Sequence, residues 1–348
     1  MDKKILLEDF NKIVLNKKVK WKTLRNKSFL ISGANGFIAT YIIHFLLFLN
    51  EKYLLNIRMI LIVRDQKKLK NKFISEKNKK NLKIIEQDIS KKITISPKQK
   101  IDYILHLASN ASPKLFNKYP IDTILPNILG TLGLLKLSII KKVKSFVFFS
   151  SGEIYGDHKG VLYEDKIFNF NHLKTRASYA ESKKMGETLC YTFFKEKKVP
   201  IKILRLFHTY GPCMNLDDGR VMMDFVNNII NNKRIIIKSD GSQKRTFCYI
   251  SDAIIGIFLI LLSGKNGEAY NLANPKEFFS IRKLGYKLSA LNNKIPVKIS
   301  IKSNSKKKFL PFNSVRPSIK KISKLGFRPS IGIKKGFEKT IKYFYSVI

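Results

Sequence analysis

The sequence predicts an α/β fold in which helices cover both faces of a parallel sheet. Apolar runs such as residues 28–32 and 59–63 have the length and β-branched content of buried strands. Helical segments alternate with these runs, as they do in βαβ units. The first strand leads directly into Gly33-Ala-Asn-Gly36 and a helix, and this arrangement lets backbone amides hold a pyrophosphate. Together these observations predict a Rossmann-type doubly wound parallel sheet, followed by a smaller C-terminal α/β substrate-binding region.

The chain is predicted to divide into three parts. The strands of the main sheet are expected at residues 28–32, 59–63, 82–86, 101–105, 145–150 and 201–206. Residues 1–27 are an amphipathic N-terminal extension that we expect to pack outside the main fold. Residues 28–207 with 244–263 form the dinucleotide-binding domain, and residues 208–243 with 264–348 form the substrate-binding region.

The charge of the chain is strongly unbalanced. Its 348 residues include 67 basic and 25 acidic side chains, a formal net charge of +42. Such a charge attracts polyanions. The lysines are scattered, however, and no nucleic-acid-binding module is readable. We therefore expect no specific nucleic-acid partner, and a non-catalytic dinucleotide-binding or RNA-binding protein is the alternative from another functional class.

The remaining composition favours a cytoplasmic protein. Cys190, Cys213 and Cys248 show no metal-ligand spacing, which predicts neither disulfides nor a metal site and fits a reducing compartment. The first residues lack a signal-peptide pattern. The apolar runs at residues 42–49 and 254–262 are too short to cross a bilayer, so no membrane association is expected.

Candidate catalytic side chains lie in two short segments. Ser151 and Glu153 follow the strand at 145–150, where an open α/β sheet binds its ligands. Tyr179 and Lys183, four residues apart in a helical segment, share one face. A free tyrosine has a pKa of about 10, and a neighbouring ammonium or an oxidised nicotinamide lowers it. Such a tyrosine can accept a hydroxyl proton while a hydride leaves the same carbon, although Tyr-x-x-x-Lys alone is a weak signal.

The end of the second strand bears on the choice of cofactor. An acidic residue there binds the ribose 2′-hydroxyl of NAD, whereas an arginine accommodates the 2′-phosphate of NADP. The sequence has both, because Arg64 and Asp65 are adjacent. NAD and NADP therefore both stay open at this point.

Four further motifs complete the pattern. They are His106-Leu-Ala-Ser-Asn-Ala-Ser-Pro113, Glu153-Ile-Tyr-Gly-Asp157, Asp218-Gly-Arg-Val221 and Gly241-Ser-Gln-Lys-Arg245. With these motifs, the chain from about residue 28 onward resembles the extended short-chain dehydrogenase/reductase superfamily, in particular its NAD-dependent nucleotide-sugar epimerases, dehydratases and decarboxylases. The motifs are most similar to those of the UDP-glucuronate decarboxylases.

The resemblance implies a role for each matching position. The catalytic set is Ser151, Glu153, Tyr179 and Lys183. The cofactor-binding set comprises Gly33, Asn35, Gly36, Phe37, Ile38, Arg64, Asp65, Asp88, Ile89, Leu107, Ala108, Ser109, Asn127 and Ser150, together with Tyr179 and Lys183. The substrate-binding set comprises His208, Thr209, Asn215, Arg220, Arg245 and Arg316, whose arginines are expected to hold a diphosphate.

The resemblance also implies a reaction. NAD, or alternatively NADP, would oxidise a nucleotide sugar at C4 and allow carbon dioxide to leave, in the synthesis of surface polysaccharide precursors by a homodimer. A 4-epimerase and a 4,6-dehydratase are the alternatives. Gly152 stands where dehydratases of the dTDP-glucose type carry an aspartate acid, which argues against loss of water. His208 and Ser318 also depart from the family pattern, at positions where the sugar nucleotide is read.

Overall fold

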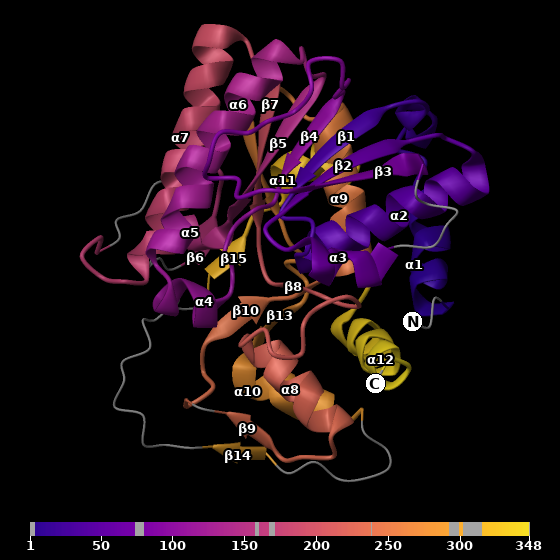
Figure 1. Ribbon diagram of the computed structural model, residues 1–348. Coiled ribbons are helices and arrows are strands. Elements are labelled where there is room, and N and C mark those ends of the chain that lie inside the picture. The colour runs from indigo at the N-terminus through magenta and orange to yellow at the C-terminus, as the bar shows by residue number, and fades with distance from the viewer. Residues whose placement is uncertain are drawn as a thin grey trace.

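The centre of the molecule is a seven-stranded parallel sheet in the order β12, β7, β5, β4, β1, β2, β3 (Figure 1). The computed structural model describes residues 4–73, 80–156, 160–166, 171–237, 239–291, 299–301 and 315–347. The strands of the sheet are β1 (Ser28–Ser32), β2 (Arg58–Val63), β3 (Leu82–Glu86), β4 (Tyr103–His106), β5 (Ser145–Ser151), β7 (Ile201–Leu206) and β12 (Glu268–Leu272). Every neighbouring pair runs parallel. The predicted doubly wound α/β fold is therefore confirmed.

The sheet buries side chains on both faces, which explains why its strands read as continuous apolar runs. In β1, Phe29 and Ile31 join one core cluster, whereas Leu30 between them joins another. The first cluster includes side chains of α2 (Phe37–Tyr53) and α9 (Ile250–Ser263). The second includes side chains of α6 (Thr131–Ile140) and α7 (Ala177–Lys197). Successive residues of a strand thus fill the two helix layers in turn.

The strand order reverses between β1 and β4. The chain runs outward from β1 through β2, α3 (Gln66–Phe73) and β3, and then crosses back to β4 on the other side of β1. Ligands bind beyond the carboxyl ends of the strands at such a reversal. The connection from β4 to β5 contains α4 (Pro113–Lys118), α5 (Ile121–Leu125), the π-helical turn η3 (Pro126–Gly130) and α6.

One continuous helical stretch, Ile121–Ile140, has the length and apolar composition of a membrane-crossing helix, but half of it is buried inside the fold. It contains α5, η3 and α6, which pack against α7. A core helix of a globular protein passes the same test, and we interpret the stretch in that way.

The smaller region is built from helices and two-stranded sheets, and Figure 1 shows α8, α10, β9 and β14 grouped beyond one end of the main sheet. The paired strands are β10 (Lys244–Thr246) with β13 (Phe278–Ser280), β11 (Cys248–Tyr249) with β8 (Thr209–Tyr210), β14 (Ile299–Ile301) with β9 (Ile235–Ile237), and β15 (Val315–Pro317) with β6 (Gly160–Leu162). The helices of this region are α8 (Val221–Ile230), α10 (Ile281–Ser289) and α12 (Ile333–Tyr345), whereas α11 (Lys320–Lys324) contacts β12 and α9 of the main domain. The predicted boundary at residue 264 needs a correction, because β12 returns to pair with β7 in the central sheet.

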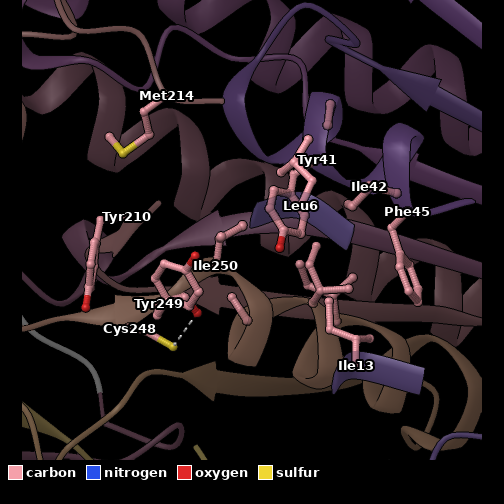
Figure 2. Close-up of a cluster of buried hydrophobic side chains, with 14 of the residues drawn as sticks. Leu6, Ile13, Tyr41, Ile42, Phe45, Tyr210, Met214, Cys248, Tyr249 and Ile250 are labelled. Carbon is pink, nitrogen blue, oxygen red and sulfur yellow. Dashed lines mark hydrogen bonds between the residues drawn. The ribbon is translucent and has the colours of Figure 1, made fainter. Parts of the chain in front are cut away.

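The N-terminal extension is part of the core, contrary to the prediction. Its helix α1 (Lys4–Val14) buries Leu6 and Ile13 in the cluster formed by α2 and α9, and Figure 2 shows both beside Tyr41, Ile42 and Phe45. The 3₁₀ turn η1 (Trp21–Leu24) follows, and its first residue packs against the same cluster. The amphipathic face of α1 is therefore a packing face of the main domain.

Asp9 explains how the extension is fixed. It is fully buried and accepts hydrogen bonds from Tyr41 at 3.1 Å and Tyr249 at 2.6 Å. Its other carboxylate oxygen accepts from the Lys339 ammonium at 2.6 Å. One carboxylate thus joins α1 to α2, β11 and α12.

Candidate active site

The predicted catalytic side chains meet at the carboxyl end of β5. Ser151 is the last residue of β5, and its hydroxyl is hydrogen-bonded to the hydroxyl of Tyr179. Lys183 donates to the carbonyl oxygen of Phe149, also in β5, at 2.7 Å. Tyr179 and Lys183 are one helical turn apart on α7 and both point toward β5. The structure therefore places the phenol and the amine on the side of α7 that the sequence spacing predicted.

Burial dominates the ionisation of these two groups. It raises the pKa of Tyr179, while the hydrogen bond from Ser151 and the positive charge of Arg220 act in the opposite direction. Burial also lowers the pKa of Lys183 to about 7. In this structure the charge that opposes the effect of burial on the phenol comes from Arg220, and the effect of the Lys183 ammonium on the tyrosine pKa stays a prediction.

Two side chains that the sequence analysis missed adjoin this centre. Arg176, just before α7, pairs with Glu153 at 2.9 Å between Nη2 and Oε2. Phe116 of α4 stacks on the Tyr179 ring with centroids 5.1 Å apart and planes at 12°, and the Arg176 guanidinium lies 5.8 Å from the Phe116 ring. Glu153 is itself fixed beside Ser151, because its backbone amide donates to the serine hydroxyl at 3.1 Å. The sequence offered one signal for Arg176, namely its position three residues before Tyr179 and so about one helical turn away. No sequence pattern marks Phe116.

Two of the predicted arginines converge near Tyr179. The Nε of Arg220 pairs with Asp218 at 3.2 Å, and its Nη2 donates to the carbonyl oxygen of Ala111 at 3.3 Å. Burial lowers the pKa of Arg245 to about 10, the charge of Glu153 raises it and that of Arg176 lowers it further. The chain therefore gathers guanidinium groups from three separate segments around one site.

His208 lies among these arginines. Its pKa is lowered to about 3, first by burial and then by the charges of Arg245, Arg220 and Arg176, so its ring is neutral at pH 7. Its Nδ1 is buried and has no hydrogen-bond partner in the described part of the chain. This ring can therefore offer a nitrogen to a ligand without adding charge.

The other predicted substrate residues lie outside this cluster. Thr209 uses its hydroxyl to donate to the carbonyl oxygen of Phe207 at 3.0 Å. Asn215 is exposed, and its side chain accepts from the backbone amide of Asp217 at 3.1 Å. Both side chains thus stabilise local turns. Asp157, the last residue of the predicted Glu153–Asp157 motif, lies outside the described residues.

Arg316 also takes a different place from the predicted one. Its Nε donates to the carbonyl oxygen of Pro275 at 2.8 Å, and its guanidinium lies 5.8 Å from the Phe278 ring. Phe278 and Arg245 face opposite sides of the β10 and β13 pair. Arg316 instead lines a surface cavity of about 710 Å³ whose other basic residues are Lys276, Lys320, Lys324 and Arg328. We therefore correct its assignment to a diphosphate site shared with Arg220 and Arg245.

The glycine turn after β1 has the geometry that a dinucleotide requires. Gly33 has φ +69°, and a Cβ there would lie 2.7 Å from the Cα of Ala108. Gly36 is the N-cap of α2, where no side chain caps the first amides. Asn35 braces the turn by donating to the carbonyl oxygen of Asp65 at 2.9 Å. The first turn of α2, which contains Phe37 and Ile38, is thus left open for a phosphate.

The residues predicted to surround the adenosine lie beside this turn. The carboxylate of Asp65 accepts from the backbone amide of Lys68 at 3.2 Å and so caps α3, while exposed Arg64 donates to Asn110 at 3.3 Å. The Asp88 side chain accepts from the amide of Ser90 at 2.9 Å, and Ile89 is buried against Gly130. Arg64 and Asp65 both remain at the end of β2, so this geometry leaves the ribose specificity open.

Two buried polar atoms without a hydrogen-bond partner within the described ranges belong to segments between the Gly33 turn and Tyr179 in the sequence. The hydroxyl of Ser109 and the amide oxygen of Asn127 are buried without a hydrogen-bond partner among the described residues. They lie with Leu107 and Ala108 in the segments that follow β4, and Asn127 donates to Ser182, next to Lys183. Buried orphan acceptors and donors indicate a missing polar ligand. The site therefore fits a dinucleotide.

Ser150 and His106 take part in hydrogen bonds inside the fold. Ser150 donates its hydroxyl to Glu187 at 2.5 Å, and Glu187 pairs with Arg205 at 2.7 Å, so this side chain belongs to an internal network instead of the predicted cofactor set. His106 is hydrogen-bonded to Ser32 and Thr131, and burial lowers its pKa to about 3. No cluster able to hold a metal ion occurs among the residues that the structure describes.

Comparison with known proteins gives consistent matches. A model of the NAD dependent epimerase/dehydratase family matches residues 29–273. The chain is 30% identical over 323 residues to UDP-glucuronic acid decarboxylase 5 of Arabidopsis thaliana, covering 89% of this chain and 87% of that protein. It is 30% identical over 330 residues to UDP-glucuronic acid decarboxylase 1 of Danio rerio, covering 91% and 72%. A solved UDP-glucuronic acid 4-epimerase from Bacillus cereus in complex with NAD has a TM-score of 0.75 and 26% identity, covering 92% of this chain and 97% of that one.

Proposed function

The chain belongs to the NAD dependent epimerase/dehydratase family, and we propose that it is an NAD-dependent enzyme that oxidises a nucleotide sugar at C4 and releases carbon dioxide from C5. The observation that carries this proposal is the hydrogen bond between Ser151 and Tyr179, beside Lys183, at the carboxyl end of β5. UDP-glucuronate is the favoured substrate, since the matched decarboxylases and the matched epimerase all carry this sugar in their names.

The chain's own residues account for the proton transfer. NAD bound at the Gly33 turn and α2 would take the hydride from C4 and return it to the C4 ketone once carbon dioxide has left, so that the cofactor ends unchanged and the product is a pentose. Tyr179 accepts the proton of the C4 hydroxyl, and Ser151 holds that hydroxyl by sharing the tyrosine hydrogen bond. Lys183 fixes the inner end of the site through its bond to Phe149. The resulting C4 ketone makes a C5 carboxylate a β-keto acid, which loses carbon dioxide as the C5 to C6 bond breaks and its electrons move to the ketone. The enolate then takes a proton at C5, and Tyr179 gives its proton back to the C4 oxygen as the ketone is reduced.

Loss of water is disfavoured by the packing at Gly152. A Cβ at this position would lie 2.6 Å from the ring of Phe207, so an aspartate acid cannot be seated there without moving that ring. Phe207 is in turn stacked on Tyr155 with centroids 6.2 Å apart. The proton donor that the resemblance associates with 4,6-dehydratases would therefore require a displaced Phe207 ring at this position.

The assay follows the fate of C6. Purified protein is incubated with NAD and UDP-glucuronate labelled at C6, and the released carbon dioxide, the mass of the sugar nucleotide and, by proton NMR, the configuration at its C4 are measured. We expect labelled carbon dioxide and a UDP-pentose. A UDP-galacturonate product of unchanged mass would instead support the 4-epimerase, and no change in the sugar with NAD bound would reject both reactions.

We further propose a cytoplasmic homodimer that supplies a polysaccharide precursor. Ile121, Leu125 and Leu129 follow one another at four-residue spacing and are 68%, 36% and 44% exposed, and Met185 on the adjoining α7 is 48% exposed. Three free cysteines fit a reducing compartment. Light scattering after size exclusion is expected to give a dimer for the native chain and a monomer for Leu129→Glu. A monomeric native chain would reject this interface.

A further inference from the structure

The side chain of Arg176 lies between the catalytic tyrosine and the outside of the site. Its guanidinium is 5.8 Å from Phe116, whose ring stacks on Tyr179, and its Nη2 is 2.9 Å from the Glu153 carboxylate. The Arg176 and Glu153 side chains are 30% and 24% exposed. The pair is therefore part of the site wall, and it is open to a ligand.

The backbone of Glu153 fixes the position of the Arg176–Glu153 ion pair relative to Ser151 and Tyr179. Its backbone amide donates to the hydroxyl of Ser151, which also bonds Tyr179. If Tyr179 acts on the C4 hydroxyl, as the proposed function states, the substituent on a carbon next to C4 lies beside Glu153 and Arg176. On a hexose ring, the bulkier of these neighbouring substituents is the C6 group carried by C5.

The charges around this point favour an anionic substituent. The guanidinium groups of Arg176, Arg220 and Arg245 all act on neutral His208. Asp218 pairs with Arg220, and Glu153 pairs with Arg176, so two carboxylates face three cations. A guanidinium has five N–H donors in a planar fork, and one such group can hold two carboxylates at once.

We propose that Arg176 is a specificity-determining residue that selects sugars carrying a carboxylate at C6. Its guanidinium bridges the substrate carboxylate and Glu153, which lets two like charges lie side by side. A neutral C6 hydroxymethyl group cannot make this bridge. The proposal rests on the proposed function only in assigning C4 to Tyr179.

Binding measurements on the NAD-loaded protein test the proposal. Dissociation constants of UDP, UDP-glucose and UDP-glucuronate are measured by calorimetry in chains that all carry Tyr179→Phe, so that turnover does not disturb the equilibrium, with Arg176 either kept or replaced by Gln or Lys. We expect Arg176→Gln to weaken UDP-glucuronate by roughly tenfold to a hundredfold, the size expected for hydrogen bonds to a charged group. UDP and UDP-glucose should stay within about twofold, and Arg176→Lys should recover part of the loss because it restores the charge without the fork.

A matched control is Arg220→Gln, which should weaken all three ligands because each carries the diphosphate. Unchanged melting temperature and NAD affinity of Arg176→Gln show that the variant is folded. Equal weakening of the three ligands by Arg176→Gln, or no weakening of any, would overturn the proposal. So would a native chain that binds UDP-glucose as tightly as UDP-glucuronate. A native chain that binds UDP-glucuronate selectively but leaves it unchanged would reject the proposed reaction and leave this inference standing.

Discussion

The role proposed for Tyr179 requires this residue to lose its proton in surroundings that disfavour the phenolate. Burial raises its pKa, and only the Ser151 hydroxyl and the charge of Arg220 oppose this effect. The stacked Phe116 ring adds packing without adding charge. The tyrosine is therefore activated by groups from other segments, and the positive charge of a bound oxidised nicotinamide adds to theirs.

Replacing Tyr179 by Phe removes the proton acceptor and keeps the ring that stacks on Phe116. We expect turnover to fall by roughly a hundredfold to ten-thousandfold, the usual contribution of general acid–base catalysis, with NAD still bound. Tyr286→Phe, at an exposed tyrosine of α10, is the matched control and should keep full activity. Turnover of Tyr179→Phe near the native rate would remove this tyrosine from the mechanism.

Lys183 makes the stability of the fold depend on pH. Its pKa is about 7 in the folded chain and about 10.4 when unfolded, so between these values the unfolded chain binds a proton that the folded chain does not. Folding stability is therefore lost as pH falls from about 10 to about 7. We expect the native chain to lose stability relative to Lys183→Met across this range, as measured by urea unfolding at pH 7 and pH 9.5. The same difference at both pH values would show that Lys183 has no lowered pKa.

At this scale the sequence was informative about positions and uninformative about energies. The four-residue spacing of Tyr179 and Lys183 fixes their common helix face, and the structure agrees. The direction of the tyrosine pKa depends on burial and on Arg220, which is 41 residues away along the chain and is brought near only by the fold. A sequence pattern could not reveal this effect.

Among the elements, the turn between β1 and α2 has the least freedom. The left-handed backbone of Gly33 and the closeness of the Ala108 backbone both require the absence of a side chain. Because Ala108 follows β4, the neighbour of β1, the two loops set each other's position at the strand reversal. The dinucleotide site is thus formed by packing between two loops.

Gly33→Ala should therefore weaken NAD binding as well as lower the stability of the fold. The new Cβ meets backbone that cannot rotate away, so we expect NAD affinity to fall at least about tenfold and stability to fall by roughly 1 to 3 kcal/mol. Gly160→Ala is a matched control, because Gly160 also has a positive φ, +95°, but nothing lies within 4 Å of its Cβ position. Calorimetry with NAD and thermal unfolding measure the two effects. Equal losses of NAD affinity in both variants would refute the contact with Ala108.

The elements also show which predictions required three dimensions. Strand and helix positions in the main sheet followed from apolar runs and their periods, because a strand buried on both faces of a parallel sheet has an unbroken apolar sequence. The return of β12 to the sheet was missed, since a short strand after an apolar helix reads alike in either region. The separation of Arg316 from Arg245 was also missed, because the pairing of β10 with β13 decides which face each residue shares.

At the scale of the whole molecule, Asp9 joins the two ends of the chain to the core. A buried carboxylate with a lysine partner and two tyrosine donors is satisfied only when α1, α2, β11 and α12 are all in place. Replacing one member of such a group leaves charge or donors unpaired, which is more costly than never having the pair.

Asp9→Asn should therefore be severely destabilising. We expect a loss of roughly 3 kcal/mol in the free energy of unfolding, because the mostly buried Lys339 ammonium loses its nearer and fully buried charged partner. Glu8→Gln is the matched control: Glu8 is half exposed, lies 3.4 Å from the same ammonium and should cost about 1 kcal/mol or less. Thermal and urea unfolding measure both variants. Similar losses for the two would mean that burial of Asp9 contributes nothing.

The ion pair between Asp9 and Lys339 can form only after both residues have been synthesised. Asp9 is synthesised 330 positions before Lys339. At about 5 to 20 residues per second, the nascent N-terminal helix waits roughly 15 to 65 seconds for its cation. During that time the buried carboxylate of α1 has no ammonium to pair with, so this part of the core is completed only after α12 has been made.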